Sequence, residues 1–222
     1  MKPGRRRIIV SRLDSAQRGD ILEAAIRAFA ARGLRGATIR LVAREARVNS
    51  ALLYYYFENK LALFTEAVRT VLHGFLAYLR TRRRPLEGAE ERLGFLVDGV
   101  FGYYTRYPER MRLMAGVVSN HPELMGRALN SILQNKTLVP LGILLEGMKK
   151  GELRRMQPVE AWWSILSLSL FSLLLRDVLG HVSHARIPLP SPELADRRKH
   201  IIGLLLHGFS PQPTHPRKGG TP

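Results

Sequence analysis

The sequence contains no cysteine and few acidic residues: 18 Asp and Glu stand against 35 Lys and Arg among 222 residues. Without cysteine, disulfide scaffolds, zinc fingers, thiol catalysis and thiol redox switches are excluded. The net charge of +17 attracts polyanions, chiefly nucleic acid or anionic lipid. Residues 1–60 carry 13 basic and 5 acidic residues. Positive charge is therefore densest there, although the remainder is also basic and net charge alone does not place a binding face.

Long hydrophobic runs are also missing. The most apolar stretch, residues 161–175, is interrupted by serines at 164, 167, 169 and 172, and it is shorter than the roughly 20 residues that a membrane span needs. We therefore expect a buried helix here and no membrane segment. Residues 1–14 lack the apolar core of a secretory signal, so a reducing cytoplasm is the expected location.

The pattern that is present is helical. Apolar residues recur at i, i+3/i+4 and i+7 between glycines and prolines, and no alternating strand pattern is found, which predicts an all-α fold. Gly33 should end a first helix over 16–32, whereas Thr38 and Asn49 should cap the next two. A longer helix should run from Lys60 to the arginines before Pro85. Further helices are predicted over 87–106, 108–119, 122–150 with a break at Pro140, 158–180 and 193–209.

The second and third predicted helices have the spacing of a helix-turn-helix, which places its second helix in the DNA major groove. The segment 38–60, above all Leu53-Tyr54-Tyr55-Tyr56-Phe57 with Lys60 three residues later, resembles the DNA-binding signature of the TetR family of bacterial transcriptional regulators. The resemblance covers about residues 16–70. Beyond it, chain length, helix number and the turn at 147–154 are similar. Arg47 stands where the family usually has glycine, and a left-handed arginine costs on the order of 1 kcal/mol.

The resemblance implies an N-terminal three-helix DNA-binding domain. Ser50 and Ala51 are small enough to approach base edges, Leu52 can contact a thymine methyl group, and hydroxyl groups can reach phosphates. Leu53 and Phe57 are expected in the core, and each tyrosine has packing as its alternative role. The predicted DNA-binding residues are Thr38, Arg40, Asn49, Ser50, Ala51, Leu52, Tyr54, Tyr55, Tyr56 and Lys60.

For the rest of the chain the resemblance implies a helical domain that binds an effector and forms a dimer. We expect four parts: a flexible basic arm at 1–14, either in a minor groove or solvated; the helix-turn-helix domain at 15–60; the effector-binding and dimerisation domain at 61–209; and a flexible tail at 210–222. Apolar helices near 162–171 and 201–209 suit a homodimer through the last two helices, with an intrachain core as the alternative.

Aromatic and methionine side chains of the middle helices favour a small apolar or aromatic effector, with His73, Tyr104 or Asn120 as polar anchors. Ordinary core packing is the alternative for most of them. The candidate pocket residues are His73, Phe75, Phe101, Tyr104, Met111, Met114, Met148, Trp162 and Phe171.

No enzyme and no cofactor is expected, because the sequence lacks a nucleophile elbow and a dinucleotide-binding glycine pattern. His181 and His184, with Asp177, lack a further defined ligand, so no metal site is predicted. The sequence thus predicts a ligand-responsive repressor that binds a palindromic double-stranded operator as a homodimer. The alternative is a small-molecule-binding helical protein with only non-specific DNA binding.

Overall fold

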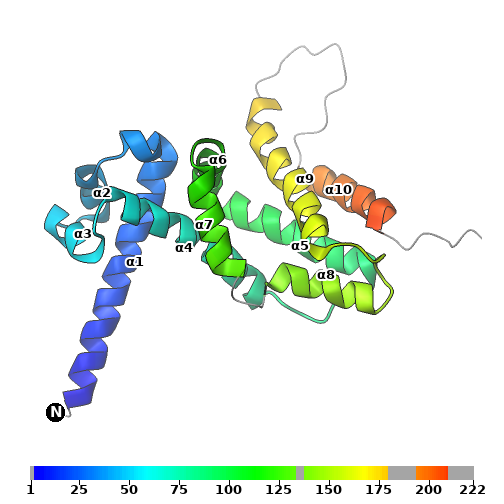
Figure 1. Cartoon of the computed structure of the whole chain (residues 1–222), viewed down its shortest axis with the longest axis horizontal. Coiled ribbons are helices and arrows are strands. Elements are labelled where there is room, and N and C mark those ends of the chain that lie inside the picture. Colours follow the sequence, from blue (N-terminus) through cyan, green and yellow to red (C-terminus); the bar gives the residue numbers. More distant parts are fainter. Residues whose placement is uncertain (1–2, 134–137, 180–193, 210–222) are drawn as a thin grey trace, which may run out of the picture. The chain divides into compact units, whose positions relative to one another are not determined.

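The computed structural model describes residues 3–133, 138–179 and 194–209, and every regular element within them is a helix (Figure 1). The all-α prediction is therefore confirmed. In chain order the helices are α1 (Pro3–Gly36), α2 (Ile39–Ala46), α3 (Ser50–Tyr56), α4 (Lys60–Thr81), α5 (Gly88–Arg106), α6 (Pro108–Asn120), α7 (Pro122–Leu133), α8 (Val139–Lys149), α9 (Pro158–Leu179) and α10 (Leu194–Phe209).

The chain forms two compact units. The first comprises Met1–Ala77 and Arg106–Lys136, and it contains α1 to α3, most of α4, and α6 and α7. The second comprises Tyr78–Thr105 and Thr137–Pro222, with α5, α8, α9 and α10. The first unit thus combines the N-terminal helices with a helix pair from the middle of the sequence.

Side-chain caps fix the starts of three helices in the first unit. The Thr38 hydroxyl oxygen accepts a hydrogen bond from the Leu41 amide at 3.2 Å, and the Asn49 side chain accepts one from the Ala51 amide at 3.0 Å. Asn59 caps α4 in the same way through the Ala62 amide. Such caps satisfy amides that lack a partner inside the helix. The predicted starts of α2 and α3 are confirmed.

The first helix is longer than its sequence pattern predicts. It begins at Pro3, so the predicted start near residue 16 is wrong. After Gly4 the segment up to residue 15 holds arginines, aliphatic residues, two serines and an aspartate, with no glycine or proline, and such a sequence tolerates a helix even without an apolar stripe. At the other end, Gly33 has φ 65° and ψ 177° and interrupts the helical geometry at the predicted cap.

The core of the first unit brings α1, α4 and α6 together. Phe29 of α1 meets Phe64 of α4 edge to face, with ring centroids 4.9 Å apart. Glu23 of α1 accepts a hydrogen bond from Arg110 of α6 at 2.7 Å. Leu53 and Phe57, which flank the end of α3, are buried as predicted. The two-turn helix α3 is therefore held by the core beneath it.

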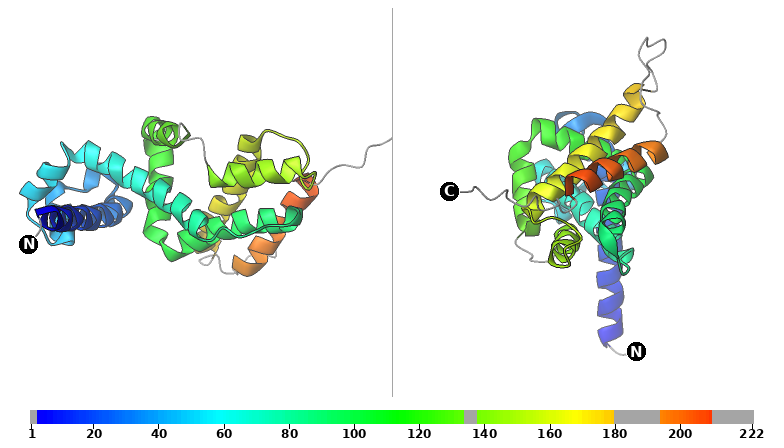
Figure 2. Two further views of the ribbon diagram at one scale, coloured as in Figure 1. Left: turned by 90° about the horizontal axis from the view of Figure 1, so that it is seen from below. Right: turned by 90° about the vertical axis from the view of Figure 1, so that its right-hand side faces the viewer.

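In the second unit α9 packs between α8 and α10, and the right-hand view of Figure 2 shows α9 and α10 side by side. The predicted break near Pro140 is confirmed, but Pro140 lies in the first turn of α8 rather than at a kink. This position suits proline because first-turn amides need no helical partner.

Hydrogen bonds and ion pairs of Arg92 fix the start of α5. Arg92 is buried, donates to the Leu86 carbonyl at 2.9 Å, and forms ion pairs with Glu146 and Glu152. A methyl group at Gly147 would lie 2.8 Å from the Arg92 Cδ atom. Glycine at this position therefore leaves the space that the arginine occupies.

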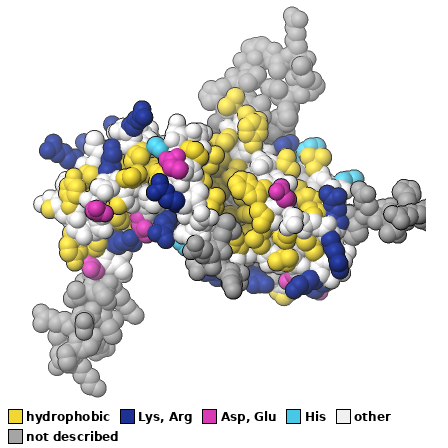
Figure 3. All heavy atoms as spheres, in the orientation of Figure 1, with side chains coloured by type: hydrophobic (Ala, Val, Ile, Leu, Met, Phe, Trp, Pro, Cys, Tyr) yellow, Lys and Arg dark blue, Asp and Glu magenta, His cyan; other side chains and the backbone are white. Residues whose placement is uncertain are grey.

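The prediction of a buried helix at 161–175 is wrong for the single chain. α9 buries Ala161, Ile165, Ser169 and Ser172, while an apolar stripe on it stays exposed. Within the described residues, Pro158–Arg176 is long and apolar enough to cross a membrane, and only 22% of that stretch is buried. Hydrophobic side chains gather along α9 in Figure 3. One face packs inside the unit, whereas the described residues leave the other face exposed.

Candidate nucleic-acid interface

The turn between α2 and α3 is built around a left-handed arginine. Arg47 has φ 56° and ψ 40°, and it is the one non-glycine residue with positive φ among those described. Its amide donates to the Arg44 carbonyl at 3.1 Å, while the Val48 amide reaches the Ala43 carbonyl at 3.0 Å. The second bond spans five residues, as in a Schellman C-cap. The turn therefore keeps the geometry of a glycine turn although the residue is arginine.

The helix α3 presents opposite faces to core and solvent. Leu53 is fully buried, whereas Tyr54 and Tyr55 are 59% and 74% exposed. Ala51 is also exposed, and Ser50 and Leu52 are half-buried. The structure thus brings small, apolar and phenolic groups together on the outer side of one short helix. This set can contact base edges and phosphates at the same time.

Polar and basic residues flank this face. Thr38 and Arg40 are exposed at the start of α2, and Asn49 is exposed at the start of α3. Because the Thr38 oxygen accepts the capping bond, its hydroxyl proton stays available for a phosphate oxygen. Lys60 is half-buried, and its ammonium group donates to the Ala37 carbonyl at 3.2 Å. Lys60 therefore also ties the start of α4 to the segment before α2.

Tyr56 differs from its two neighbours. Its hydroxyl donates to the Asp14 carboxylate, and this hydrogen bond raises the pKa of Tyr56 to about 12. The two residues are 42 positions apart, and the sequence pattern gave no signal for their pairing. Asp14 is thus a positioning residue for the end of α3 that sequence reasoning missed.

Arg18 is a second residue that the sequence pattern did not single out. Its guanidinium lies over the Phe57 ring at 5.3 Å from the centroid and forms a 3.3 Å ion pair with Glu66 of α4. Arg18 therefore links α1 to the end of α3 and to α4. These contacts hold the outward face of α3 on a fixed support, which is what a recognition surface needs.

The predicted effector residues fall into both units. His73, Phe75, Met111 and Met114 lie in the first unit, where His73 is exposed and the other three are buried. In the second unit Phe101 and Tyr104 are buried, Met148 and Trp162 are half-buried, and Phe171 is 61% exposed. The Asn120 side chain is exposed and donates to the Gly116 carbonyl. Their shared role in one pocket stays a prediction.

Metal-binding chemistry has little support in the described residues, which contain no group of three or more His, Asp or Glu side chains placed to hold an ion. His181 and His184 lie outside the described residues.

Known proteins are similar in sequence over the segment that forms this interface. The family model for bacterial regulatory proteins of the tetR family matches residues 21–67, which include α2, α3 and the start of α4. The chain is 32% identical over 98 residues to the HTH-type transcriptional repressor NicS of Pseudomonas putida, a match over 44% of this chain and 46% of NicS. The match thus spans about half the length of NicS. The match to the HTH-type transcriptional repressor SCO4008 of Streptomyces coelicolor likewise spans 52% of that protein.

A longer sequence match and a similar solved structure extend the similarity beyond the N-terminal helices. The HTH-type transcriptional regulator RutR of Escherichia coli K12 is 30% identical over 156 residues, which cover 67% of this chain and 69% of RutR. The structure of FadR from Bacillus subtilis in complex with stearoyl-CoA superposes with a TM-score of 0.67 at 19% identity, over 85% of this chain and 97% of FadR. The chain therefore belongs to the TetR family of bacterial regulatory proteins.

Proposed function

We propose that the protein is a transcriptional repressor that binds a palindromic operator as a homodimer and is released by a small apolar or aromatic effector. The observation that carries the DNA-binding part is the outer face of α3, with Tyr54 and Tyr55 more than half exposed above a buried Leu53. Ser50, Ala51 and Leu52 read base edges, whereas Thr38, Arg40, Tyr54 and Tyr55 contact phosphates. Such a regulator acts in the cytoplasm, where the DNA is.

Each predicted residue has a role set by its surroundings. Asn49 positions α3 through its cap. Lys60 contacts the DNA phosphate backbone while its ammonium group also donates to the Ala37 carbonyl. Tyr56 supports α3 through Asp14, so its hydroxyl reaches a phosphate only if this contact opens. The names of NicS and RutR, a repressor and a regulator, support a role in transcription.

Selection of bound fragments from the source genome at about physiological salt tests the DNA-binding proposal, because non-specific phosphate binding is weakened there. We expect one inverted repeat to be enriched. Arg40→Gln should weaken binding across sequences and reduce the salt slope by about one, whereas Arg112→Gln, at an exposed arginine of α6, should change neither. Indiscriminate recovery of fragments would favour a small-molecule-binding protein with only non-specific DNA contact.

The exposed stripe of α9 supports the homodimer. Val159, Trp163, Phe171 and Val178 are 44%, 54%, 61% and 57% exposed, and Leu204 of α10 is 49% exposed. Apolar side chains that repeat along one helix face mark an interaction surface when the described part of the chain leaves them exposed. A second copy covers them with the same face through two-fold symmetry. Phe171 therefore fits the dimer surface better than the effector pocket.

Light scattering and sedimentation measure the dimer directly. Phe171→Asp should shift the protein to a monomer, because it places a charge in the centre of an apolar interface. The control is Leu145→Asp, which introduces the same charge at an exposed leucine of α8 and should leave the dimer intact. A dimer that survives Phe171→Asp, or one that both variants disrupt equally, contradicts an interface centred on α9.

The effector proposal rests on the buried aromatic and methionine side chains of α4 to α6 and on the complex of FadR with stearoyl-CoA. In the first unit α6 contacts α1 and pairs with it through Arg110 and Glu23, so a shift of α6 strains the support of α3. Effectors can be found by screening apolar ligands for release of a labelled operator. If no ligand releases the operator while repeat-specific binding persists, the protein binds DNA constitutively.

A further inference from the structure

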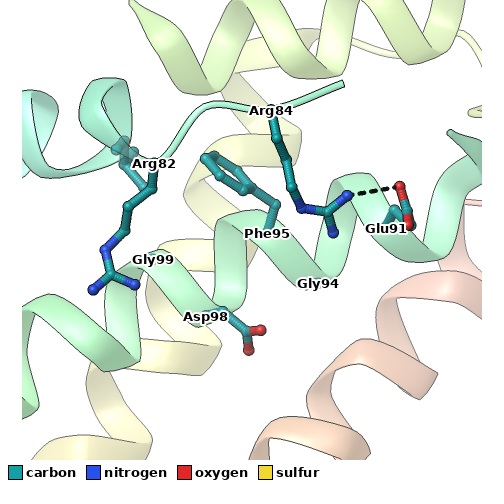
Figure 4. Close-up of a pocket in the computed structure, with 8 residues that line it drawn as sticks. Arg82, Arg84, Glu91, Gly94, Phe95, Asp98 and Gly99 are labelled. Atoms are coloured by element: carbon teal, nitrogen blue, oxygen red, sulfur yellow. Dashed lines mark hydrogen bonds and ion pairs between the residues drawn. The ribbon is translucent and has the colours of Figure 1, made fainter. Parts of the chain in front are cut away.

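A cavity of about 280 Å³ lies in the second unit between α5 and the segment that follows α4 (Figure 4). Leu79, Arg82 and Arg84 line it from one side, and five α5 residues line it from the other: Glu91, Gly94, Phe95, Asp98 and Gly99. In Figure 4 the Arg82 and Arg84 side chains lie on either side of the Phe95 ring. None of the predicted effector residues lines this cavity.

Some charged side chains of the cavity form ion pairs with described residues, and one does not. Arg84 donates to Glu91 at 3.2 Å and to the Pro85 carbonyl, so its charge is largely compensated within the cavity wall. Asp98 accepts hydrogen bonds from Arg198. Within the described part of the chain, no carboxylate lies within ion-pair distance of Arg82. Because both acidic groups already have a cationic partner, Arg82, which is exposed, is the cation of the cavity lining that has no ion-pair partner among the described residues.

The Tyr78 ring holds the Arg82 side chain in place. Its guanidinium stacks on the Tyr78 ring at 4.3 Å from the centroid, and Tyr78 packs on Tyr103 at 5.5 Å. A methyl group at Gly102 would lie 2.5 Å from the Tyr78 hydroxyl, so glycine leaves room for this ring. Stacking fixes the guanidinium plane and leaves its N–H edge available.

The segment that carries both arginines is also fixed at its far end. The Arg92 guanidinium donates to the Leu86 carbonyl at 2.9 Å, and the Glu87 amide donates to the Glu91 carboxylate at 2.9 Å. Arginines in a mobile basic loop would lose side-chain and backbone entropy on binding, whereas this anchoring reduces that cost. These contacts distinguish the cavity from a merely solvated basic run.

We propose that this cavity binds a small molecule carrying one anionic oxygen group, a phosphate or a carboxylate, next to an apolar moiety. Arg82 pairs with the anion through its free N–H edge, and Phe95 and Leu79 contact the apolar part. The volume lies just below the about 300–1,000 Å³ of typical ligand pockets, which suits a compact ligand. The site is separate from operator recognition, and its occupancy can be measured without DNA.

Calorimetric titration with phenyl phosphate and with benzoate tests the proposal, with benzyl alcohol as the neutral probe. We expect saturable binding of at least one anion, one per chain, and no saturation by the alcohol. Arg82→Gln should weaken binding about tenfold or more, the loss expected for a charge-assisted hydrogen bond. Arg83→Gln removes the same charge from an exposed neighbour that does not line the cavity, and it should change affinity less than twofold or so.

Two further measurements keep the outcomes distinct. Arg82→Lys retains the charge without the planar fork and should bind with intermediate affinity; circular dichroism confirms that each variant is folded. Equal losses from Arg82→Gln and Arg83→Gln, or no saturable anion binding, would overturn the site. It would also be overturned if duplex DNA displaced phenyl phosphate and lost affinity on Arg82→Gln, because the arginine would then contact a DNA backbone. The tighter of the two anions identifies the ligand class.

Discussion

Replacement of Arg47 by glycine should stabilise the protein, although glycine usually weakens helical structure. The backbone at Arg47 is left-handed, with φ 56°, and its side chain is exposed. An L-residue with a Cβ atom pays about 1–2 kcal/mol in this conformation, and glycine does not. Glycine in turn loses about 0.4–1 kcal/mol through the greater freedom of the unfolded chain. The difference leaves a net gain of about 0.5–1 kcal/mol.

Urea unfolding followed by circular dichroism measures this gain as a rise in midpoint at unchanged slope. In a thermal scan, the shift should be about 1–4 °C for a chain of this size. Arg47→Ala removes the same side chain but keeps the Cβ atom, so it should have little effect. Arg44→Gly places glycine at an exposed helical position of α2 and should destabilise by about 1 kcal/mol.

The difference in unfolding free energy between Arg47→Gly and Arg44→Gly tests whether the backbone at Arg47 is strained. If Arg47→Gly destabilised the protein as much as Arg44→Gly, the turn would not be left-handed, and the reasoning from backbone strain would be refuted. A gain shared by Arg47→Gly and Arg47→Ala would instead assign the effect to the arginine charge.

Three further predictions concern packing and pH. Gly147→Ala should destabilise by about 1–3 kcal/mol in urea unfolding, because its methyl group would press on buried Arg92. The hydrogen bond to Asp14 raises the pKa of Tyr56 to about 12 from 10, so the stabilisation by this bond is complete below pH 10 and is lost toward pH 12; Tyr56→Phe should remove a tyrosinate step near pH 12 from the absorbance titration. The hydrogen bond from Arg92 lowers the pKa of Glu152 below 4.5, so its contribution is present above pH 4.5 and is lost on acidification; Glu152→Gln should flatten the pH dependence of the urea midpoint below 4.5.

Matched variants control these three experiments. Gly142→Ala lies in the same helix with open space around it and should stabilise slightly. Tyr54→Phe changes an exposed tyrosine of α3 and should leave the step near pH 12 in place. Glu160→Gln, at an exposed position of α9, should keep the acid dependence of the wild type. A loss of stability in Gly142→Ala equal to that in Gly147→Ala would contradict the steric explanation.

Local signals explain why much of the first unit could be predicted from the sequence. Thr38 and Asn49 cap helices within three residues of themselves, and such short-range bonds depend on residue type and spacing alone. Leu53 and Phe57 follow from the helical period in the same way. The start of α1 could not be predicted, because the segment before residue 16 mixes arginines with β-branched and polar residues of moderate helix propensity and carries no apolar stripe.

Contacts between distant parts of the chain escaped prediction. Asp14 and Tyr56, or Arg92 and Glu152, meet only after the helices have packed, and no local pattern pairs them. The partial exposure of α9 was missed for a related reason. Hydropathy shows that a helix needs cover, but it does not show whether that cover comes from the same chain or from another.

The shortness of α3 has a consequence for how this surface can change. Seven residues are too few to form a stable helix in water, where about 12–15 are needed, so the order of α3 comes from Leu53 and Phe57 beneath it. Its outward residues contribute little to folding. Under the proposed role of α3 in operator recognition, substitutions there alter the preferred DNA sequence without much loss of stability. On that proposal, mutational drift can retarget the protein to new operators while its fold stays the same.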